Sequence, residues 1–168
     1  MVSTSFSVAE LLQLTSSLWR AGRDYARRAE LLLGIFGLRD RARSQLVSLS
    51  HGQRRLASVV AAVALDRPLL LVDEATAALD PEAVIALREV VRVAAERGAG
   101  VVVATQDLHF AELVCDRVSL LSAGRVVADG TIVELRRLHS AATLEGVFVA
   151  ALGVTGRLRE LRDALDAL

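Results

Sequence analysis

The chain contains 168 residues, of which 53% are hydrophobic, and its 20 basic and 20 acidic side chains leave no net charge. Every basic side chain is arginine, which excludes a lysine-bearing phosphate loop or a Schiff-base lysine within these residues. The neutral balance argues against a nucleic-acid partner. The single cysteine, Cys115, excludes an intrachain disulfide, and no apolar run reaches the roughly 18 residues that cross a bilayer. These features predict one compact, soluble, cytosolic unit.

The first part of the chain has a helical pattern. Ser7 and Glu10 have the spacing of a capping box, which predicts a helix start. That helix is expected to stop near Gly22, and a second one is expected over Asp24–Phe36. The side chains expected to be buried are Leu11, Leu12, Leu14, Leu18 and Trp19 in the first helix, and Leu31, Leu32, Ile35 and Phe36 in the second.

From residue 46 onwards the pattern alternates between helix and strand. The apolar strands are predicted over Leu69–Val72 and Gly100–Thr105. Uniformly apolar strands between helices indicate a parallel sheet that is covered on both faces, so the predicted fold class is α/β. The other predicted elements are helices over Ser50–Leu65, Asp80–Arg97, Leu108–Cys115, Thr131–Leu138 and Gly156–Leu168, and a hairpin over Arg117–Ala128.

Two adjacent carboxylates, Asp73 and Glu74, follow the first apolar strand. Open α/β folds bind ligands at the carboxyl edge of a parallel sheet. Two neighbouring acids repel each other, so the pair indicates a bound cation or a role in proton transfer. A solvated strand end is an equally simple interpretation of the acids taken alone.

The motif LSHGQ (Leu49–Gln53) directly precedes a predicted helix. Ser50 has the position of an N-cap, and Gln53 that of its capping-box partner. Gly52 leaves the backbone bare, which would let a ligand approach closely, and the amides at a helix N-terminus favour anions. Alone, such a motif is more often an ordinary helix start. The neighbouring pair Arg54-Arg55 is expected on a solvated face, with contact to a phosphate as the alternative.

The two motifs, in this order and at this spacing, resemble the second half of an ATP-binding-cassette (ABC) nucleotide-binding domain. LSHGQ is similar to the LSGGQ signature, LLLVDE to the Walker B strand, and ATAALD to the D-loop. The stretch that begins VVVATQD resembles the switch-loop strand with its helix and hairpin, and TLEGVFVAALG resembles the tail of ATPases that serve ABC-2-type exporters. The resemblance implies an incomplete P-loop NTPase-like parallel sheet. It divides the chain into a helical subdomain (1–48), a signature-to-switch part of the ATPase core (49–140) and a C-terminal helical tail (141–168).

The resemblance also implies ATP and Mg²⁺ as cofactors and roles for single residues. Asp73 would hold Mg²⁺ through water, and Glu74 would polarise the attacking water as general base. Gln106 stands at the switch position, where the family normally has histidine. Glutamine can donate a hydrogen bond to a phosphate but cannot carry a positive charge there.

The signature and the D-loop would act on a second nucleotide-binding domain, in a homodimer or a heterodimer. Ser50 and Gly52 would donate to the γ-phosphate of ATP held by that domain, and Asp80 would couple the two sites. His51 replaces the first glycine of the signature, which makes close approach of a phosphate less certain. The residues implied to bind ATP are Leu49, Ser50, His51, Gly52, Gln53 and Asp80.

The motif G-x-x-x-x-G-K-[ST] is absent from the 168 residues. The leading interpretation is therefore an N-terminally truncated ATP-binding subunit of an ABC exporter, in the cytoplasm at the inner face of the membrane, bound to an ABC-2-type permease. Its signature would complete a site on a partner domain, while the chain alone would be inactive. The alternative is a non-catalytic regulatory or interaction module that keeps the fold.

Overall fold

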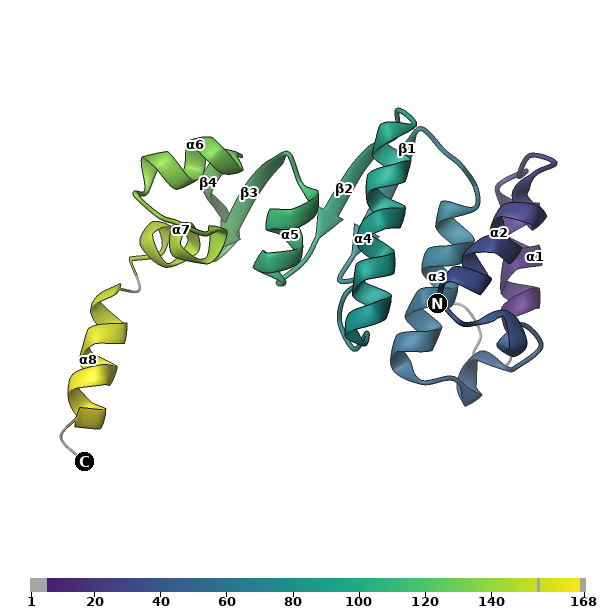
Figure 1. Ribbon diagram of the computed structural model, residues 1–168, viewed down its shortest axis with the longest axis horizontal. Helices are drawn as coiled ribbons and strands as arrows, with labels where there is room; N and C mark the ends of the chain where they lie inside the picture. Colours follow the sequence, from purple (N-terminus) through teal and green to yellow (C-terminus); the bar gives the residue numbers. More distant parts are fainter. Residues whose placement is uncertain (1–5, 154, 167–168) are drawn as a thin grey trace. The chain divides into compact units, whose positions relative to one another are not determined.

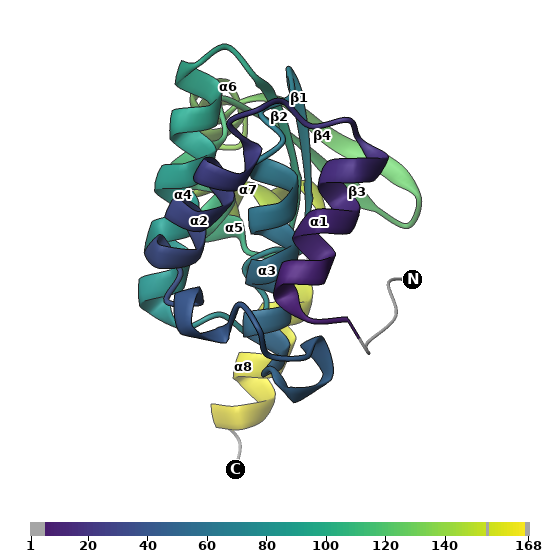
Figure 2. The same cartoon turned by 90° about the vertical axis from the view of Figure 1, so that its right-hand side faces the viewer.

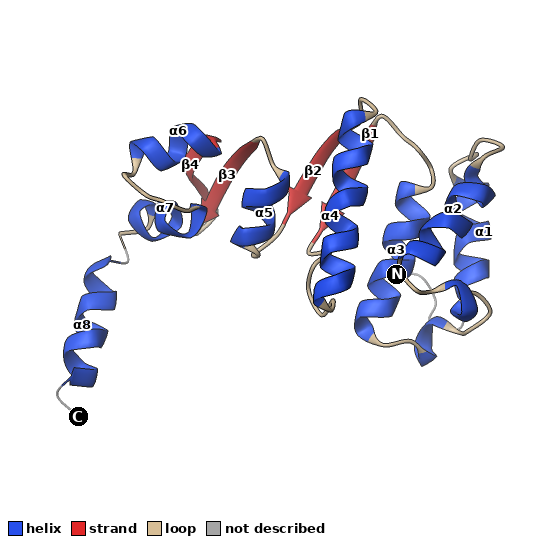
Figure 3. Cartoon of the chain, viewed as in Figure 1, coloured by secondary structure: helices blue, strands red, loops and turns tan. Residues whose placement is uncertain are grey.

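The computed structural model describes residues 6–153 and 155–166, so the outermost residues of the predicted helical subdomain and tail lie outside the described part. The chain divides into two compact units, unit 1 (Met1–Gln106) and unit 2 (Asp107–Leu168). Both combine helices with strands (Figure 3), which confirms the predicted mixed α/β class. Among the described residues, no helix is long and apolar enough to cross a membrane.

Unit 1 begins with helices α1 (Val8–Leu18), α2 (Tyr25–Ile35) and α3 (His51–Val63), with short 3-10 turns at Arg39–Arg41 and Leu46–Ser48. Both α1 and α2 pack against α3 (Figures 1 and 2). The predicted capping box is present at the start of α1, because the Ser7 hydroxyl accepts from the Glu10 amide and the Glu10 carboxylate accepts from the Ser7 amide.

The last turn of α3 is held by α2. The Arg28 Nε donates to the Ala64 carbonyl at 2.8 Å, and the Arg28 guanidinium also pairs with Asp66 at 3.4 Å. A cation beside the last carbonyls of a helix is favourable because the helix dipole is negative there. This contact joins α2 to the connection that leads from α3 into the sheet.

The predicted buried faces of the first two helices are partly wrong. Leu18 and Trp19 are more than half exposed at the end of α1, and so are Leu31 and Ile35 on α2. The buried residues are instead Val8 and Leu11 of α1, and Tyr25, Ala29 and Leu33 of α2 with Phe36 after it. Both helices carry apolar residues on more than one side, and the position of α3 decides which side is covered.

Strands β1 (Leu69–Asp73) and β2 (Gly100–Ala104) form a parallel pair in which Leu69 lies beside Gly100 and Asp73 beside Ala104. Helix α4 (Pro81–Glu96) connects them. As predicted, Asp80 caps α4 and proline occupies its first position, where an amide would be unsatisfied anyway. Helix α3 packs against β1, and α4 packs against β2.

Only one face of this sheet is covered, so the prediction of cover on both faces is wrong for the described residues. Leu70 and Val72 are buried, whereas Leu69 and Leu71 are 55% and 69% exposed. Val102 lies beside Leu71 on the same face and is 57% exposed. Parallel sheets are normally buried on both sides, so this face is an exposed apolar patch.

Unit 2 consists of α5 (Leu108–Val114), the antiparallel strands β3 (Arg117–Ser122) and β4 (Arg125–Thr131), and helices α6 (Ile132–Leu138), α7 (Leu144–Ala151) and α8 (Thr155–Asp166). The predicted hairpin and the capping box of Thr131 with Glu134 are confirmed. The Glu112 carboxylate accepts from the Leu144 amide at 3.2 Å and pairs with Arg136, so α5 ties α6 and α7 together. The core of unit 2 consists of Ala111, Leu120, Leu135, Leu144 and Val147.

The open apolar face of β1 and β2 predicts that the 168-residue chain self-associates, since exposed strand faces and edges are prone to pairing. The double substitution of Leu71→Lys and Val102→Lys should shift the chain to smaller species, as measured by sedimentation velocity. Val133→Lys changes a 77% exposed valine on α6 and should leave association unchanged. A monodisperse monomer of the unmodified chain would contradict this expectation.

Candidate functional site

Unit 1 contains all the candidate residues, which come from four places in the chain. The signature motif lies at the start of α3, the acid pair at the end of β1, and Asp80 at the start of α4. Gln106 follows β2 by two residues. The first two turns of α3 contact the segment that follows β1, so the structure brings the signature and the acid-bearing segment together.

The start of α3 is a complete capping box. The Ser50 hydroxyl accepts from the Gln53 amide at 3.1 Å, and the Gln53 side-chain oxygen accepts from the Ser50 amide at 3.1 Å. Leu49 is buried, whereas Ser50 and His51 are exposed. The remaining amides of the first turn and the positive end of the helix dipole therefore accompany an exposed serine and histidine, an arrangement that suits an anion.

Gly52 is buried, and its bare backbone faces the chain itself rather than open space. A Cβ atom at this position would overlap the carbonyl oxygen of Ala78 and lie 3.4 Å from Leu79 Cδ2. Glycine is required here because the turn after β1 approaches α3 too closely for any side chain. The expectation that Gly52 leaves room for a ligand is therefore corrected: the turn after β1 occupies that room.

The acid pair sits where β1 turns sharply. Asp73 is exposed and is the last residue of β1, while Glu74 is half-buried with φ at 48°. The Glu74 amide donates to the Ala104 carbonyl at 2.8 Å, which extends the pairing with β2 by one bond. A left-handed conformation is unfavourable for glutamate by about 1 kcal/mol or more, so surrounding contacts must hold this turn.

Two more predicted residues lie at the ends of this region. Asp80 is exposed, and its Oδ1 accepts from the Ala83 amide at 2.8 Å, which assigns it a structural role as the cap of α4. Gln106 is exposed just beyond β2. Since β1 and β2 are parallel neighbours, Gln106 follows the same carboxyl edge of the sheet as the acid pair.

The donor set at this edge suits Mg²⁺. Mg²⁺ prefers oxygen ligands and is usually bound through one or two carboxylates together with phosphates of a substrate. Asp73 and Glu74 supply carboxylates of that kind at the end of a strand. The described residues contain no group of three or more acids, histidines or cysteines placed to hold a metal without other ligands.

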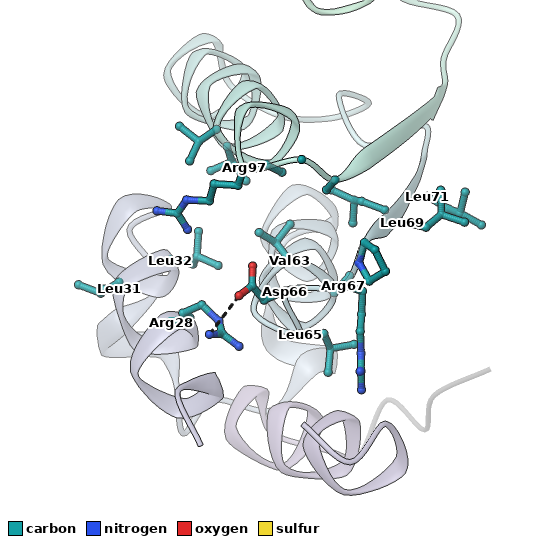
Figure 4. Close-up of a pocket in the computed structure, with 18 of the residues that line it drawn as sticks. Arg28, Leu31, Leu32, Val63, Leu65, Asp66, Arg67, Leu69, Leu71 and Arg97 are labelled. Atoms are coloured by element: carbon teal, nitrogen blue, oxygen red, sulfur yellow. Dashed lines mark ion pairs between the residues drawn. The ribbon is translucent and has the colours of Figure 1, made fainter. Parts of the chain in front are cut away.

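Unit 1 also contains an apolar cavity of about 1490 Å³, lined by residues of α2, α3, α4 and the start of β1. The Arg28–Asp66 ion pair lies in it among leucine and valine side chains (Figure 4). The residues that line it do not include the signature motif, the acid pair, Asp80 or Gln106. This cavity is therefore separate from the candidate site.

Sequence reasoning missed the role of Arg55. Its guanidinium is half-buried and donates to the main-chain carbonyl of Glu74, so it does not lie on a solvated face as expected. The pattern of the sequence contained no signal for this contact, because Arg55 and Glu74 are 19 residues apart and the bond uses the main chain.

Cys115 in unit 2 does not have the surroundings of a reactive thiol. Partial burial raises the pKa of its thiol, and the charge of the neighbouring Asp116 raises the pKa further. Because the thiolate is the reactive form, this environment disfavours nucleophilic chemistry at Cys115.

Comparison with known proteins identifies the family. A family model described as an AAA domain, with the AbiEii toxin and Type IV TA system in its description, matches residues 4–112. A solved structure of the ATP binding subunit of an ABC transporter has a TM-score of 0.84 and 32% identity, over 90% of this chain and 65% of that one. The chain belongs to the AAA/ABC-type ATPase domains.

Curated relatives agree with this ABC-type family. The methionine import ATP-binding protein MetN of Streptomyces coelicolor is 33% identical over 147 residues, which cover 87% of this chain and 42% of that protein. The daunorubicin/doxorubicin resistance ATP-binding protein DrrA of Streptomyces peucetius is 36% identical over 150 residues, which cover 82% and 44%. The chain thus spans about two fifths of the length of these ABC-type relatives.

The close approach at Gly52 predicts that Gly52→Ala destabilises this ABC-type domain. An added methyl group would push the turn after β1 away from α3, at a cost of about 1–3 kcal/mol in the free energy of unfolding, measurable by urea denaturation. Gly22→Ala is the matched control, because a Cβ atom there has no neighbour within 4 Å. Equal free energies of unfolding for Gly52→Ala and Gly22→Ala would contradict the close approach of the turn after β1 to α3.

Proposed function

We propose that this chain acts as the signature-bearing part of an ABC-transporter ATP-binding subunit. It would bind MgATP together with a second nucleotide-binding domain, and ATP hydrolysis would drive transport through a membrane permease. The observation that carries the proposal is the exposed, capped N-terminus of α3 held next to the acid-bearing end of β1 within unit 1. An anion-binding helix end and a cation-binding acid pair together suit a nucleotide with its metal ion.

The proposed roles follow from the chemistry of each group. Ser50 and the first amides of α3 would donate to the γ-phosphate of ATP on the partner domain, and His51 would lie beside that phosphate. Asp73 would hold Mg²⁺ through water, and Glu74 would orient the attacking water. Mg²⁺ neutralises the charge that develops on the phosphates, and phosphoryl transfer depends mainly on such positioning and electrostatics.

The second domain is proposed because these 168 residues contain no G-x-x-x-x-G-K-[ST] motif and no lysine. Without that loop, the chain's own residues have no cradle for the β- and γ-phosphates. The signature can still complete a site on a partner domain that carries the loop. Asp80, exposed at the start of α4, would contact the partner across the interface, and unit 1 would be the part that dimerises.

The membrane-bound partner is proposed to be an ABC-2-type export permease, with the chain at the cytoplasmic face of the membrane. Support comes from the Thr143–Gly153 segment, which resembles the tail of such ATPases, and from the relative named for daunorubicin and doxorubicin resistance. The relatives named for methionine import favour the opposite direction. Uptake and efflux assays in membranes that contain the cognate permease distinguish the two directions.

A second candidate function is a non-catalytic regulatory module that keeps the fold. The specific observation in its favour is Gln106 at the switch position, where the family normally has histidine. Glutamine cannot supply the positive charge of a protonated histidine. This candidate predicts that the chain binds its partners equally well with and without ATP.

We predict that the 168-residue chain alone does not hydrolyse ATP measurably, as tested by phosphate release with Mg²⁺ present. ATP hydrolysis by the chain alone that is lost in Glu74→Gln would contradict this prediction, because it would show that the chain contains a complete catalytic site.

We further predict that the chain associates with a nucleotide-binding domain that carries a phosphate loop, and that this association needs MgATP. Ser50→Ala should weaken it about tenfold or more, since a hydrogen bond to a charged group contributes roughly 1.5–3 kcal/mol. The equilibrium constant is measurable by analytical ultracentrifugation or fluorescence anisotropy.

Ser7→Ala is the matched control, because Ser7 forms the same capping box at the start of α1. Each substitution should cost about 1 kcal/mol of stability through the lost cap, but only Ser50→Ala should change the association. Association that is equally strong with and without ATP would favour the regulatory module. Equal effects of Ser50→Ala and Ser7→Ala on the association would show that Ser50 does not contact the nucleotide.

A further inference from the structure

Helix α3 holds the turn after β1 at two separate points. At the first turn of α3, Gly52 lies directly against the Ala78 carbonyl. At the second turn, the Arg55 guanidinium donates to the Glu74 carbonyl. Glu74 and Ala78 have φ of 48° and 63°, so both contacts fall on residues in the left-handed conformation.

The Glu74 main chain has three bonds, and Arg55 supplies the only one from α3 among the described residues. The Glu74 amide donates to the Ala104 carbonyl at 2.8 Å, and the Glu74 carbonyl accepts from the Ala77 amide at 3.2 Å. Without Arg55, that carbonyl would keep only the longer bond within its own turn. The φ and ψ of Glu74 set the direction of its Cα–Cβ bond, from which the side chain starts, so a less restrained carbonyl would leave the carboxylate less well positioned.

Arg55 does not act on the carboxylate directly. Among the described residues, no ion pair joins Arg55 to an aspartate or a glutamate. Among the residues that the structure describes, no ion pair involves the Glu74 carboxylate either. A charged donor also makes a stronger bond to a carbonyl than a neutral one does, which suits the task of holding an unfavourable backbone conformation.

We propose that Arg55 is a positioning residue, which sets the direction of the Glu74 carboxylate by holding the Glu74 main chain against α3. What Glu74 then does rests on the proposed function, whereas the bond itself does not. Since the same helix starts with Ser50, a movement of α3 on binding a phosphate would reach the Glu74 main chain through the Arg55 bond, in addition to the contact of Gly52 with the Ala78 carbonyl.

The experiment is amide hydrogen exchange on the full 168-residue chain without nucleotide or partner. Arg55→Met keeps the length of the aliphatic stem and removes the donor. We expect the amides of Ala77 and Leu79, which bond within the turn, to exchange about threefold to tenfold faster, as the loss of one hydrogen bond predicts. Amides in the middle of α3, such as that of Val60, should be unchanged.

Two further variants separate positioning from general destabilisation. Arg92→Met removes a half-exposed arginine on α4 and should change none of these amides. Arg55→Lys restores a charged donor and should return the exchange of Ala77 at least halfway to the original rate. It also serves as the test variant if Arg55→Met does not fold. The lysine ammonium group lacks the planar fork of the guanidinium, so the Ala77 amide should still exchange faster than in the unmodified chain.

Unchanged exchange at Ala77 and Leu79 in Arg55→Met would overturn the assignment, and so would equal acceleration throughout α3. Because the experiment contains no ATP, its outcome is independent of whether the chain associates with a partner domain. If the chain shows no ATP-dependent association with a partner domain, the proposed function is wrong. The hydrogen-exchange result for Arg55 still stands in that case.

Discussion

The contact between the first turns of α3 and the turn after β1 is the constraint on which the candidate site depends. Gly52 allows the Ala78 carbonyl to approach the helix, and Arg55 binds the Glu74 carbonyl one turn further on. Neither contact uses the side chains expected to meet ATP or Mg²⁺. The groups that hold the site together are thus different from the groups that would do chemistry, which leaves Ser50 and Asp73 exposed.

Two short motifs stabilise a helix end and also stand at a proposed contact with a ligand or a second domain. Ser50 and Gln53 satisfy each other in a capping box and also stand at the end of α3 that is proposed to bind an anion. Asp80 caps α4 and also lies exposed, where a second domain could reach it. A cap fixes the helix end without burying it, so stability and binding do not compete at these positions.

The sheet of unit 1 is covered on one face and open on the other. Its covered face is supplied by α3 and α4, yet Leu71 and Val102 on the other face are open to solvent. The relatives are more than twice as long as the part that this chain matches. Parallel sheets are normally covered on both faces, and the proposed pairing with a second domain likewise calls for a second polypeptide.

The sequence by itself determined the local structure and the family. Capping boxes at Ser7, Ser50 and Thr131 and the apolar strands depend on neighbours in the chain, so their spacing predicts them. Only the tertiary structure decided which face of α2 is buried, which face of β1 stays open, and what fills the space above Gly52. These depend on residues 19 or more positions apart meeting in space, as Arg55 and Glu74 do, and a contact through a main-chain carbonyl leaves no pattern of residue types to read.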